Sequence, residues 1–410
     1  MQDNEKKPAL RFKGFTDPWE QRKLAELTKT ITTGKSVNSD EGEVSDGDIG
    51  VLKTSCVSYD RFNSSESKPV VKSEQQLVKC AVEKDSVIVS RMNTPERVGA
   101  CGYVSTDFPN LFLPDRLWKL KFQDTVDTYF VYMMLVSSAY KEKITSMASG
   151  TSGSMYNIPK ETFLNLQLVI PAKIDEQKQL GKILKKIDTL ITLHQRKYEK
   201  LVNIKKSMLD KMFPQNGASV PEIRFKGFTD PWEQRKLGEI AVFSKGVGYS
   251  KNDLCEEGTP IILYGRLYTK YETCIFDVDT FVKEKAGSVH SKGGEVIVPA
   301  SGETAEDISI ASVVVKPGIL LGGDLNIVSP TAEYNSAFLA LTISSGATHK
   351  YLSSLAQGKS VVHLHNADIQ SVSAKFPTKR EQEKIHLLFG KIDTLITLHQ
   401  REHIKPILEV

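Results

Sequence analysis

Basic, amide and aromatic side chains gather in three loops of this sequence, and that mixture is typical of a surface that contacts nucleic acid. In the first loop, Arg91, Asn93 and Arg97 follow directly after the strand-like run DSVIVS. Arginine can bind guanine through two hydrogen bonds and asparagine can bind adenine, whereas lysine neutralises phosphates. Each loop by itself also fits an ordinary solvated basic loop. The other two loops, SKGVGYSK and YGRLYTKY, contribute Lys245, Tyr249, Lys251, Tyr264, Arg266, Tyr268, Lys270 and Tyr271.

The sequence motifs of common enzymes are missing. A phosphate-binding loop needs GxxxxGK[ST], and the triplets Gly34-Lys35-Ser36 and Gly358-Lys359-Ser360 lack its first glycine, so we interpret them as loops. No HExxH, GxSxG or strand-preceded GxGxxG is present. His363 and His365 would point to one face of a strand, but a polar loop pair is commoner than a metal site. We therefore predict neither a catalytic nor a metal site; an enzyme with an unrecognised site is the alternative.

The composition is that of a globular protein of two or three domains. The chain has 410 residues, of which 40% are hydrophobic and 25% charged, and its formal net charge is +4. A mildly basic charge permits an anionic partner without requiring one. Five cysteines in no close pairs indicate free thiols in a reducing compartment. We find no signal-like segment and no run near the ~20 apolar residues of a membrane span, so we expect a cytoplasmic location and no membrane partner.

Two segments occur twice without change. RFKGFTDPWEQRKL stands at 11–24 and at 224–237, and KIDTLITLHQR stands at 186–196 and at 391–401. Between these constant segments the two halves differ almost completely. A duplication keeps its copies alike where both do one job and lets them diverge where the jobs differ, so we expect one partner bound twice and two different targets. Recent recombination of the ends would explain the identity but not the divergence.

The apolar pattern predicts an α+β protein with two mainly β domains, joined by two long antiparallel helices that form a coiled-coil spacer. Leu184, Ile187, Ile191 and Tyr198 form a heptad-type stripe that requires a partner helix. Short β-branched runs between Gly, Pro and Ser turns fill both halves. We expect strands at 260–263, 295–298, 308–315 and 318–328, and helices at 127–147 and 336–355. The predicted boundaries are 1–171 and 214–376 for domains related by pseudo-two-fold symmetry, 172–213 for the central helix and 377–410 for the C-terminal helical repeat.

Trp19 and Trp232 stand at equivalent places in the duplicated entry segment, among otherwise charged residues. Either they form a small hydrophobic plug at the base of each domain, or part of this surface docks a partner subunit. His194 and His399 interrupt the helical stripe at equivalent places. We interpret them as polar residues that fix the register of an antiparallel helix pair, and a pH sensor is the alternative.

Together these features make the chain similar to the DNA-specificity subunits of Type I restriction–modification systems. The resemblance covers essentially the full length. Its specific part is the duplicated entry segment together with a proline, Glu-Gln and a helix, at 171–177 and 377–382. In the second half SKGVGYSK, YGRLYTKY, PASGETAEDI, GGDLNI and AQGKSVVHLHNADI appear in an order shared by one type of recognition domain. The second helix departs from the family pattern, because only Glu402–Val410, with Pro406 inside, follows its repeat.

The resemblance implies a non-catalytic subunit whose two domains each read one half of a split, asymmetric sequence in double-stranded DNA. The helices would set the gap between the halves and dock two adenine-N6 methyltransferase subunits, and motor–nuclease subunits would join them. S-adenosylmethionine, and ATP with magnesium, are then expected on those partners, and no cofactor on this chain. A free-standing regulator with two duplex-binding domains is the alternative.

Further candidate contacts complete the two predicted surfaces. The DNA-binding set also contains Lys35, Ser36, Ser301, Glu303, Lys359, His363 and His365. The partner-binding set contains Trp19, Trp232, Lys186, Asp188, Gln195, Arg196, Asp393, Gln400 and Arg401.

Overall fold

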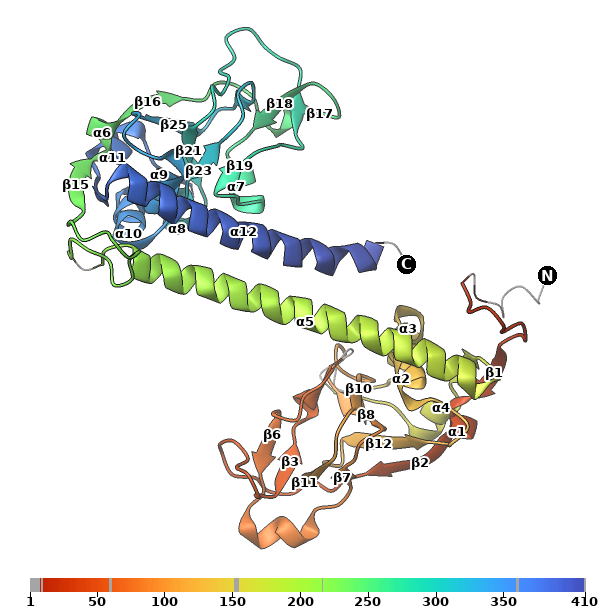
Figure 1. The fold of residues 1–410 in the computed structure, drawn as a ribbon. Helices are drawn as coiled ribbons and strands as arrows, with labels where there is room; N and C mark the ends of the chain where they lie inside the picture. The colour runs from red at the N-terminus through yellow and green to blue at the C-terminus, as the bar shows by residue number, and fades with distance from the viewer. Residues whose placement is uncertain are drawn as a thin grey trace. The chain divides into compact units, whose positions relative to one another are not determined.

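The computed structural model describes residues 8, 10–58, 61–150, 155–215, 217–358 and 361–408, with side chains described as far as residue 400. The chain divides into two compact units, Met1–Leu190 (unit 1) and Ile191–Val410 (unit 2). Helix α5 (Ile174–Met212) begins in unit 1 and ends in unit 2, and helix α12 (Lys379–Leu408) belongs to unit 2 (Figure 1). None of the helices in the described ranges has the length and apolar character that crossing a bilayer requires.

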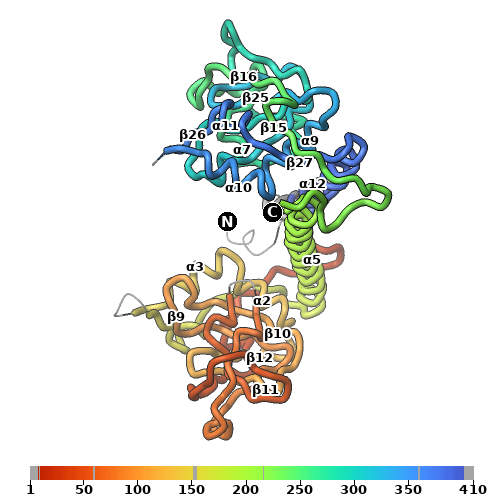
Figure 2. The backbone as a smooth tube through the Cα atoms, turned by 90° about the vertical axis from the view of Figure 1, so that its left-hand side faces the viewer, coloured from red at the N-terminus to blue at the C-terminus, as the bar shows by residue number. Residues whose placement is uncertain are grey.

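The main sheet of unit 1 consists of the antiparallel strands β10 (Cys101–Val104), β8 (Ser86–Ser90), β12 (Leu117–Phe122) and β2 (Thr28–Thr33), in that order. Strand β8 is wholly buried, because its run SVIVS presents β-branched side chains to both faces. Helix α2 (Thr128–Val136) packs on β8 and β10, and Figure 2 shows α2 and α3 (Ser138–Ser146) together on one side of this sheet.

A second sheet in unit 1 consists of β6 (Ser67–Pro69), β3 (Gly50–Leu52), β11 (Phe108–Phe112) and β7 (Ala81–Val82), in that order. The predicted helix at 127–147 is in fact the two helices α2 and α3. Ser137 between them is extended, and its hydroxyl donates to the Met134 carbonyl, so its side chain competes with continued helical bonding. The remaining elements are β1 (Glu20–Lys23), α1 (Leu24–Leu27), β4 (Val57–Ser58), β5 (Arg61–Phe62), β9 (Met92–Asn93), β13 (Tyr156–Asn157), α4 (Lys160–Leu164) and β14 (Gln167–Ile170).

Unit 2 repeats this plan with different strands. Its main sheet consists of β16 (Ala241–Lys245), β25 (Leu325–Pro330), β21 (Glu295–Pro299), β23 (Ser312–Val314) and β19 (Cys274–Ile275), in that order. A second sheet consists of β17 (Leu254–Cys255), β20 (Phe281–Val282), β18 (Thr259–Ile262) and β24 (Leu320–Leu321). The remaining elements are β15 (Glu233–Lys236), α6 (Leu237–Ile240), α7 (Arg266–Thr269), β22 (Ser301–Gly302), α8 (Ala305–Ile308), α9 (Ser336–Ile343), α10 (Gly346–Leu355), β26 (Val362–His363), α11 (Asn366–Ser371) and β27 (Ser373–Phe376).

Three predicted elements of unit 2 are divided or shortened. The helix predicted at 336–355 is broken into α9 and α10, because Ser345 is extended and Gly346 has φ +61°. The strand predicted at 318–328 is interrupted at 322–324, where Asp324 has φ 57° and turns the chain between β24 and β25. The strand predicted at 308–315 begins only at Ser312, because the Thr304 hydroxyl caps α8 just before it.

The long helices contribute to the cores that they cover. On α5, Leu180 and Leu184 pack against the core of unit 1. Met212 belongs to the core of unit 2, and Met208 packs against it. Within unit 2, α12 runs antiparallel to the second part of α5, because His194 Nδ1 lies 3.0 Å from His399 Nδ1 and Lys205 pairs with Asp393 at 2.5 Å. The predicted fold class, α+β with long helices joining mainly β domains, is confirmed.

Each unit is closed at its base by the same arginine–glutamate pair. The Arg11 guanidinium donates two hydrogen bonds to Glu176, of 2.7 and 2.8 Å, and Arg224 donates two of the same lengths to Glu381. Both glutamates are buried at the start of a long helix, and the paired strands β1–β14 and β15–β27 lie beside them. We call this arrangement the base clasp. It fastens the entry of each domain to its exit.

Candidate nucleic-acid interface

In unit 1, three loops meet where strands of the main sheet end. Gly34 lies so close to Leu113 that an added Cβ would stand 1.5 Å from its carbonyl oxygen. The Ser36 hydroxyl donates to Asp115 at 2.5 Å, and the Arg91 amide donates to the Arg116 carbonyl. These contacts bring the segments 34–36, 91–97 and 113–117 together, although they lie far apart in the sequence.

Arg91 is held in one orientation at this place. Its Nε donates to the Asp115 carbonyl at 2.9 Å, and its guanidinium carbon lies 6.0 Å from the centre of the Trp118 ring. The two terminal nitrogens of Arg91 make no hydrogen bond to any of the residues that the structure describes. The side chain is half-buried. An arginine fixed through Nε and free at its terminal nitrogens is suited to bidentate contact with a guanine edge.

The residues around Arg91 differ in their exposure. Lys35 and Arg97 are exposed and suited to phosphate contact. Asn93 is buried instead, and its amide donates to the Ser90 hydroxyl while its oxygen accepts from the Thr94 amide, so it shapes the loop. Arg116, in the segment 113–117, is also exposed and was not among the residues predicted from the sequence, although Trp118 and Lys119 follow it closely.

In unit 2, a second cluster forms around the short strand pair β22–β26. The Tyr268 hydroxyl donates to the Ser301 carbonyl at 2.6 Å, and Ser301 Oγ lies 3.1 Å from His363 Nδ1. The Ala300 amide donates to the carbonyl of Asp324, an exposed residue that sequence analysis also missed. Figure 2 shows strand β26 at the margin of unit 2. Glu303, His363 and His365 are exposed.

The glycine loop that contains Lys245 lies beside this cluster. Gly246 donates its amide to the Leu325 carbonyl, and Gly323 donates to Gly248 at 2.6 Å, so loop 245–248 packs on turn 322–324. An added Cβ at Gly246 would stand 1.9 Å from the Gly322 oxygen, which explains the glycine. Lys245 is exposed at the edge of this packed pair of loops.

Tyr249 and Tyr271, two of the other predicted residues, have internal hydrogen-bond partners. The Tyr249 hydroxyl lies 2.5 Å from Ser288 Oγ and accepts from the Lys285 amide, so its polar end is used inside the domain. Tyr271 donates to the Ala311 carbonyl at 3.3 Å, away from β22. Lys251 is exposed, and Tyr264 is exposed and in edge-to-face contact with Tyr268. Lys359 lies outside the described residues.

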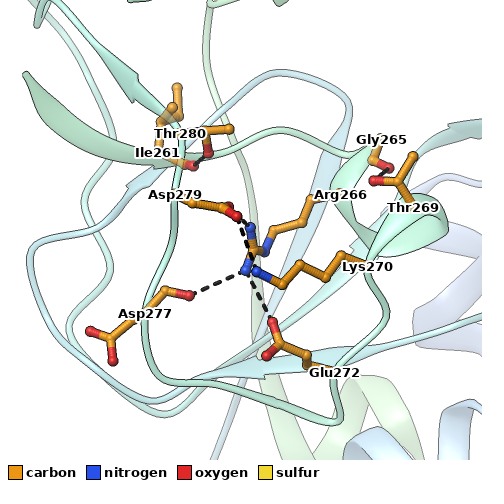
Figure 3. Close-up of polar contacts among 9 residues, drawn as sticks. All are labelled: Ile261, Gly265, Arg266, Thr269, Lys270, Glu272, Asp277, Asp279 and Thr280. Carbon is orange, nitrogen blue, oxygen red and sulfur yellow. Dashed lines mark hydrogen bonds and ion pairs between the residues drawn. The ribbon is translucent and has the colours of Figure 1, made fainter. Parts of the chain in front are cut away.

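Arg266 lies in an internal ion-pair network, which does not fit its predicted exposure to DNA (Figure 3). Only 8% of the residue is exposed, and its terminal nitrogens donate to Asp279 at 2.5 Å, to Glu272 at 3.0 Å and to the Asp277 carbonyl at 3.2 Å. Lys270 donates to the same Asp279 at 3.0 Å. Glu272 and Asp279 follow the YGRLYTKY segment, within thirteen positions of Arg266. Because its guanidinium pairs with these carboxylates, it points into the domain. We therefore assign Arg266 to holding the loop in shape.

Asp279 gives this network a testable pH dependence. Hydrogen bonds from Lys270 and Arg266 lower the pKa of Asp279 to about 2, below its ordinary 3.8. Because the folded state binds this proton less tightly than the unfolded state, the contribution is present above pH 4 and is lost as the pH falls through 2. We expect Asp279→Asn to reduce the fall in stability between pH 4 and 2, as measured by urea unfolding. Asp277→Asn is the control and should leave the pH dependence of stability unchanged. If Asp279→Asn also left it unchanged, the assignment of Asp279 to this ion-pair network would be contradicted.

The residues predicted to bind partners divide into two groups. Asp188 accepts from the Tyr129 hydroxyl at 3.3 Å, and Asp393 accepts from Thr273 at 2.9 Å, so both fasten a helix to its own unit. Lys186, Arg196 and Gln400 are exposed, Gln195 is half-buried, and the Arg401 side chain lies outside the described residues.

The two tryptophans form the plugs at the domain bases. Trp232 is 4% exposed within the core of unit 2 and contacts Phe213 and Phe338, so it offers no docking surface. Trp19 packs edge-to-face on Phe130, and its Nε1 donates to Glu176 at 3.3 Å. The plug interpretation fits both placements.

The fold and these two loop surfaces define a duplicated recognition protein, with one polar loop surface on each of two similarly clasped β domains. In the described ranges, no three His, Cys, Asp or Glu side chains are grouped as metal ligands. The family model of the "Type I restriction modification DNA specificity domain" matches residues 16–203 and again 229–407. The chain therefore belongs to the Type I restriction–modification DNA specificity family.

Two known proteins extend this comparison. The chain is 23% identical over 288 residues to the Type I restriction enzyme MjaVIII specificity subunit of Methanocaldococcus jannaschii, in a match that spans 67% of this chain and 65% of that relative. The crystal structure of a Type-I restriction-modification system S subunit from M. genitalium superposes with a TM-score of 0.61 at 16% identity, over 97% of this chain and 94% of that one. The second likeness is one of fold.

Proposed function

We propose that this chain is the DNA-reading, non-catalytic specificity subunit of a Type I restriction–modification complex. Each unit reads one half of a bipartite, asymmetric target in double-stranded DNA, through the loops around Arg91 in unit 1 and around the β22–β26 pair in unit 2. The observation that carries the proposal is the contrast within the fold. The base clasp is the same in both units, whereas the loop surfaces share neither residues nor contacts.

The repeated helical segment supports docking of one kind of partner at two places. Leu190 and Leu193 on α5 are 55% and 46% exposed. Their repeat equivalents on α12, Leu395 and Leu398, are 45% and 50% exposed. Exposed leucines at identical positions of an exact repeat fit two copies of one protein surface. We propose that they dock two adenine methyltransferase subunits, which supply S-adenosylmethionine chemistry, and that motor–nuclease subunits supply ATP and magnesium chemistry.

The direct test uses Arg91. Arg91→Ala should relax recognition at one base pair of one half-site and weaken binding there by roughly 5- to 150-fold, because a bidentate base contact contributes ~1–3 kcal/mol. The measurement is selection of duplexes from a random pool by the full chain with its methyltransferase partner, followed by sequencing. Lys35→Ala is the matched control, since loss of a phosphate contact weakens binding equally for all sequences.

Two outcomes would overturn the proposal. If Arg91→Ala altered both half-sites equally, the units would not read DNA independently. If the full chain, purified without partners, methylated DNA by itself, then catalysis would belong to this chain.

A further inference from the structure

A pocket of about 280 Å³ lies at the base of unit 2, and we call it the base pocket. Strands β15 and β27, the start of helix α10 and the residues directly after α5 contribute to its lining. These elements are separate from the loops around β22 and β26 that we assign to DNA. The described residues that line the pocket include one lysine, Lys375, and no aspartate or glutamate.

Helix α10 begins at the base pocket without a side-chain cap. Gly346, Ala347 and Thr348 form its first turn, and all three line the pocket. The first amides of a helix have no carbonyl to bond within that helix. Ser345, the residue before α10, donates its hydroxyl back to the Leu341 carbonyl at 2.6 Å and does not cap these amides. The start of α10 therefore contributes partial positive charge to the pocket.

The indole of Trp232 adds a donor that the fold leaves without an acceptor. Trp232 lines the pocket and is 4% exposed, and its Nε1 has no hydrogen-bond partner among the residues that the structure describes. A buried indole N–H ordinarily has an acceptor. The equivalent indole of unit 1, that of Trp19, donates to the Glu176 carboxylate at 3.3 Å. The same tryptophan of the repeat is thus satisfied by a carboxylate in unit 1 and lacks one in unit 2.

Lys375 brings a full positive charge to the same pocket. Its Nζ donates to the carbonyls of Gly217 and Ala218 at 2.7 and 2.5 Å, which holds the ammonium group in place. Neither of these partners is charged, so they leave the charge of Lys375 without compensation. Helix amides, an indole N–H and an ammonium group around a pocket without carboxylates favour an anionic ligand.

The other walls of the base pocket are apolar. Phe213, Pro214 and Tyr351 line it, and Tyr351 is 53% exposed. The pocket has room for one side chain, whereas a nucleic-acid backbone would present a row of phosphates. A glutamate in an apolar segment fits both kinds of wall, because its methylene groups can contact the rings while its carboxylate accepts hydrogen bonds.

We propose that the base pocket binds one carboxylate of an acidic protein segment, so that unit 2 has a peptide-docking site apart from its DNA-reading loops. The start of α10 and Lys375 hold the carboxylate, and the ring of Tyr351 contacts the apolar part of the segment. This site goes beyond the proposed function, because its occupation does not require DNA.

The test titrates the full chain with two tripeptides whose ends are blocked, and whose middle residue is glutamate or glutamine between two leucines. With Trp19 and Trp118 changed to Phe, the fluorescence of Trp232 reports on the pocket that it lines. We expect a saturable change with the glutamate peptide. The glutamine peptide should bind roughly tenfold more weakly, because hydrogen bonds to an ionised acceptor are stronger than those to a neutral one.

Two variants place the ligand at the start of α10. Ala347→Glu puts a carboxylate into the first turn, where it is favourable for the helix and competes with the ligand, so the glutamate peptide should bind roughly tenfold more weakly. Ser354→Glu is the matched control, because it adds the same charge to an exposed position in the last turn of the same helix and should leave binding unchanged. Urea unfolding followed by Trp232 checks that both variants are folded.

Each other outcome would overturn the proposal in a different way. Equal binding of the two peptides would show that the pocket does not select an anion. Equal affinities of Ala347→Glu and Ser354→Glu for the glutamate peptide would show that the carboxylate does not bind at the start of α10. If inorganic phosphate changed the fluorescence of Trp232 and neither peptide did, the pocket would bind a free anion and not a protein segment. A chain that responds to none of these probes would have no anion site here.

Discussion

Arg224→Ala should lower the free energy of unfolding of unit 2 by about 3 kcal/mol, because it leaves the Glu381 carboxylate buried without its cation. Glu381 is fully buried, and both of its oxygens accept from Arg224, at 2.7 and 2.8 Å. The loss should be confined to the unit whose clasp is broken. Unit 1 retains the equivalent pair of Arg11 with Glu176.

The measurement needs a probe that reports on unit 2 alone. The chain has three tryptophans, and Trp232 lies in the core of unit 2 against Phe213. With Trp19 and Trp118 changed to Phe, the fluorescence of Trp232 follows urea unfolding of unit 2. Arg235→Ala is the control, because its pair with Glu233 is solvent-exposed and screened by water, so its loss should leave the unfolding of unit 2 nearly unchanged.

A second substitution separates the lost contact from the buried charge. Arg224→Met combined with Glu381→Leu removes both partners, and should restore most of the stability that Arg224→Ala loses, since a buried ion pair can be replaced by apolar packing at little cost. If the double variant were as unstable as Arg224→Ala, the loss of stability would come from the missing Arg224–Glu381 contact itself. It would then not come from leaving the Glu381 carboxylate buried without a partner.

The sequence allowed prediction of the features that arise from repetition and periodicity. The exact repeats located the two ends of each domain, and the heptad-type stripe predicted the long helices, because an amphipathic pattern over forty residues has few other solutions. The breaks within shorter elements were not predictable in this way. Ser137 and Ser345 end helices through extended backbone, and a serine in an apolar run gives no strong sign of which state it will adopt.

The candidate site was harder to predict than the fold. Arg91 and Arg266 look alike in the sequence, since each stands in a loop with polar neighbours. Their surroundings differ, because Arg91 meets a carbonyl and a tryptophan ring, whereas Arg266 meets two carboxylates from the next loop and turns inward. Contacts between distant segments decide whether an arginine is presented or buried, and no local pattern records them.

An insertion of Glu-Ala-Ala-Lys between Leu190 and Ile191 should lengthen the gap between the two half-sites without changing either half. The structure favours this position over one after Arg196. The contacts of α5 with unit 1 extend to Asp188, which accepts from Tyr129, and the contacts with α12 include His194 and Lys205. An insertion after Arg196 would separate those last two contacts and disturb the packing of unit 2.

The length and the rotation of the insertion make separate predictions. Four residues lengthen a helix by about 6 Å, which corresponds to about one to two base pairs of DNA. They rotate its far end by only ~40°, so both domains should still be able to bind the same duplex. Two residues add only about 3 Å but rotate the far end by ~200°, so that variant should lose specific binding altogether. The measurement is mapping of N6-methyladenine in a host that carries the variant with its partner subunits. An unchanged gap after the four-residue insertion would show that α5 does not set the spacing, and a functional two-residue variant would show that the connection is not a continuous rigid helix.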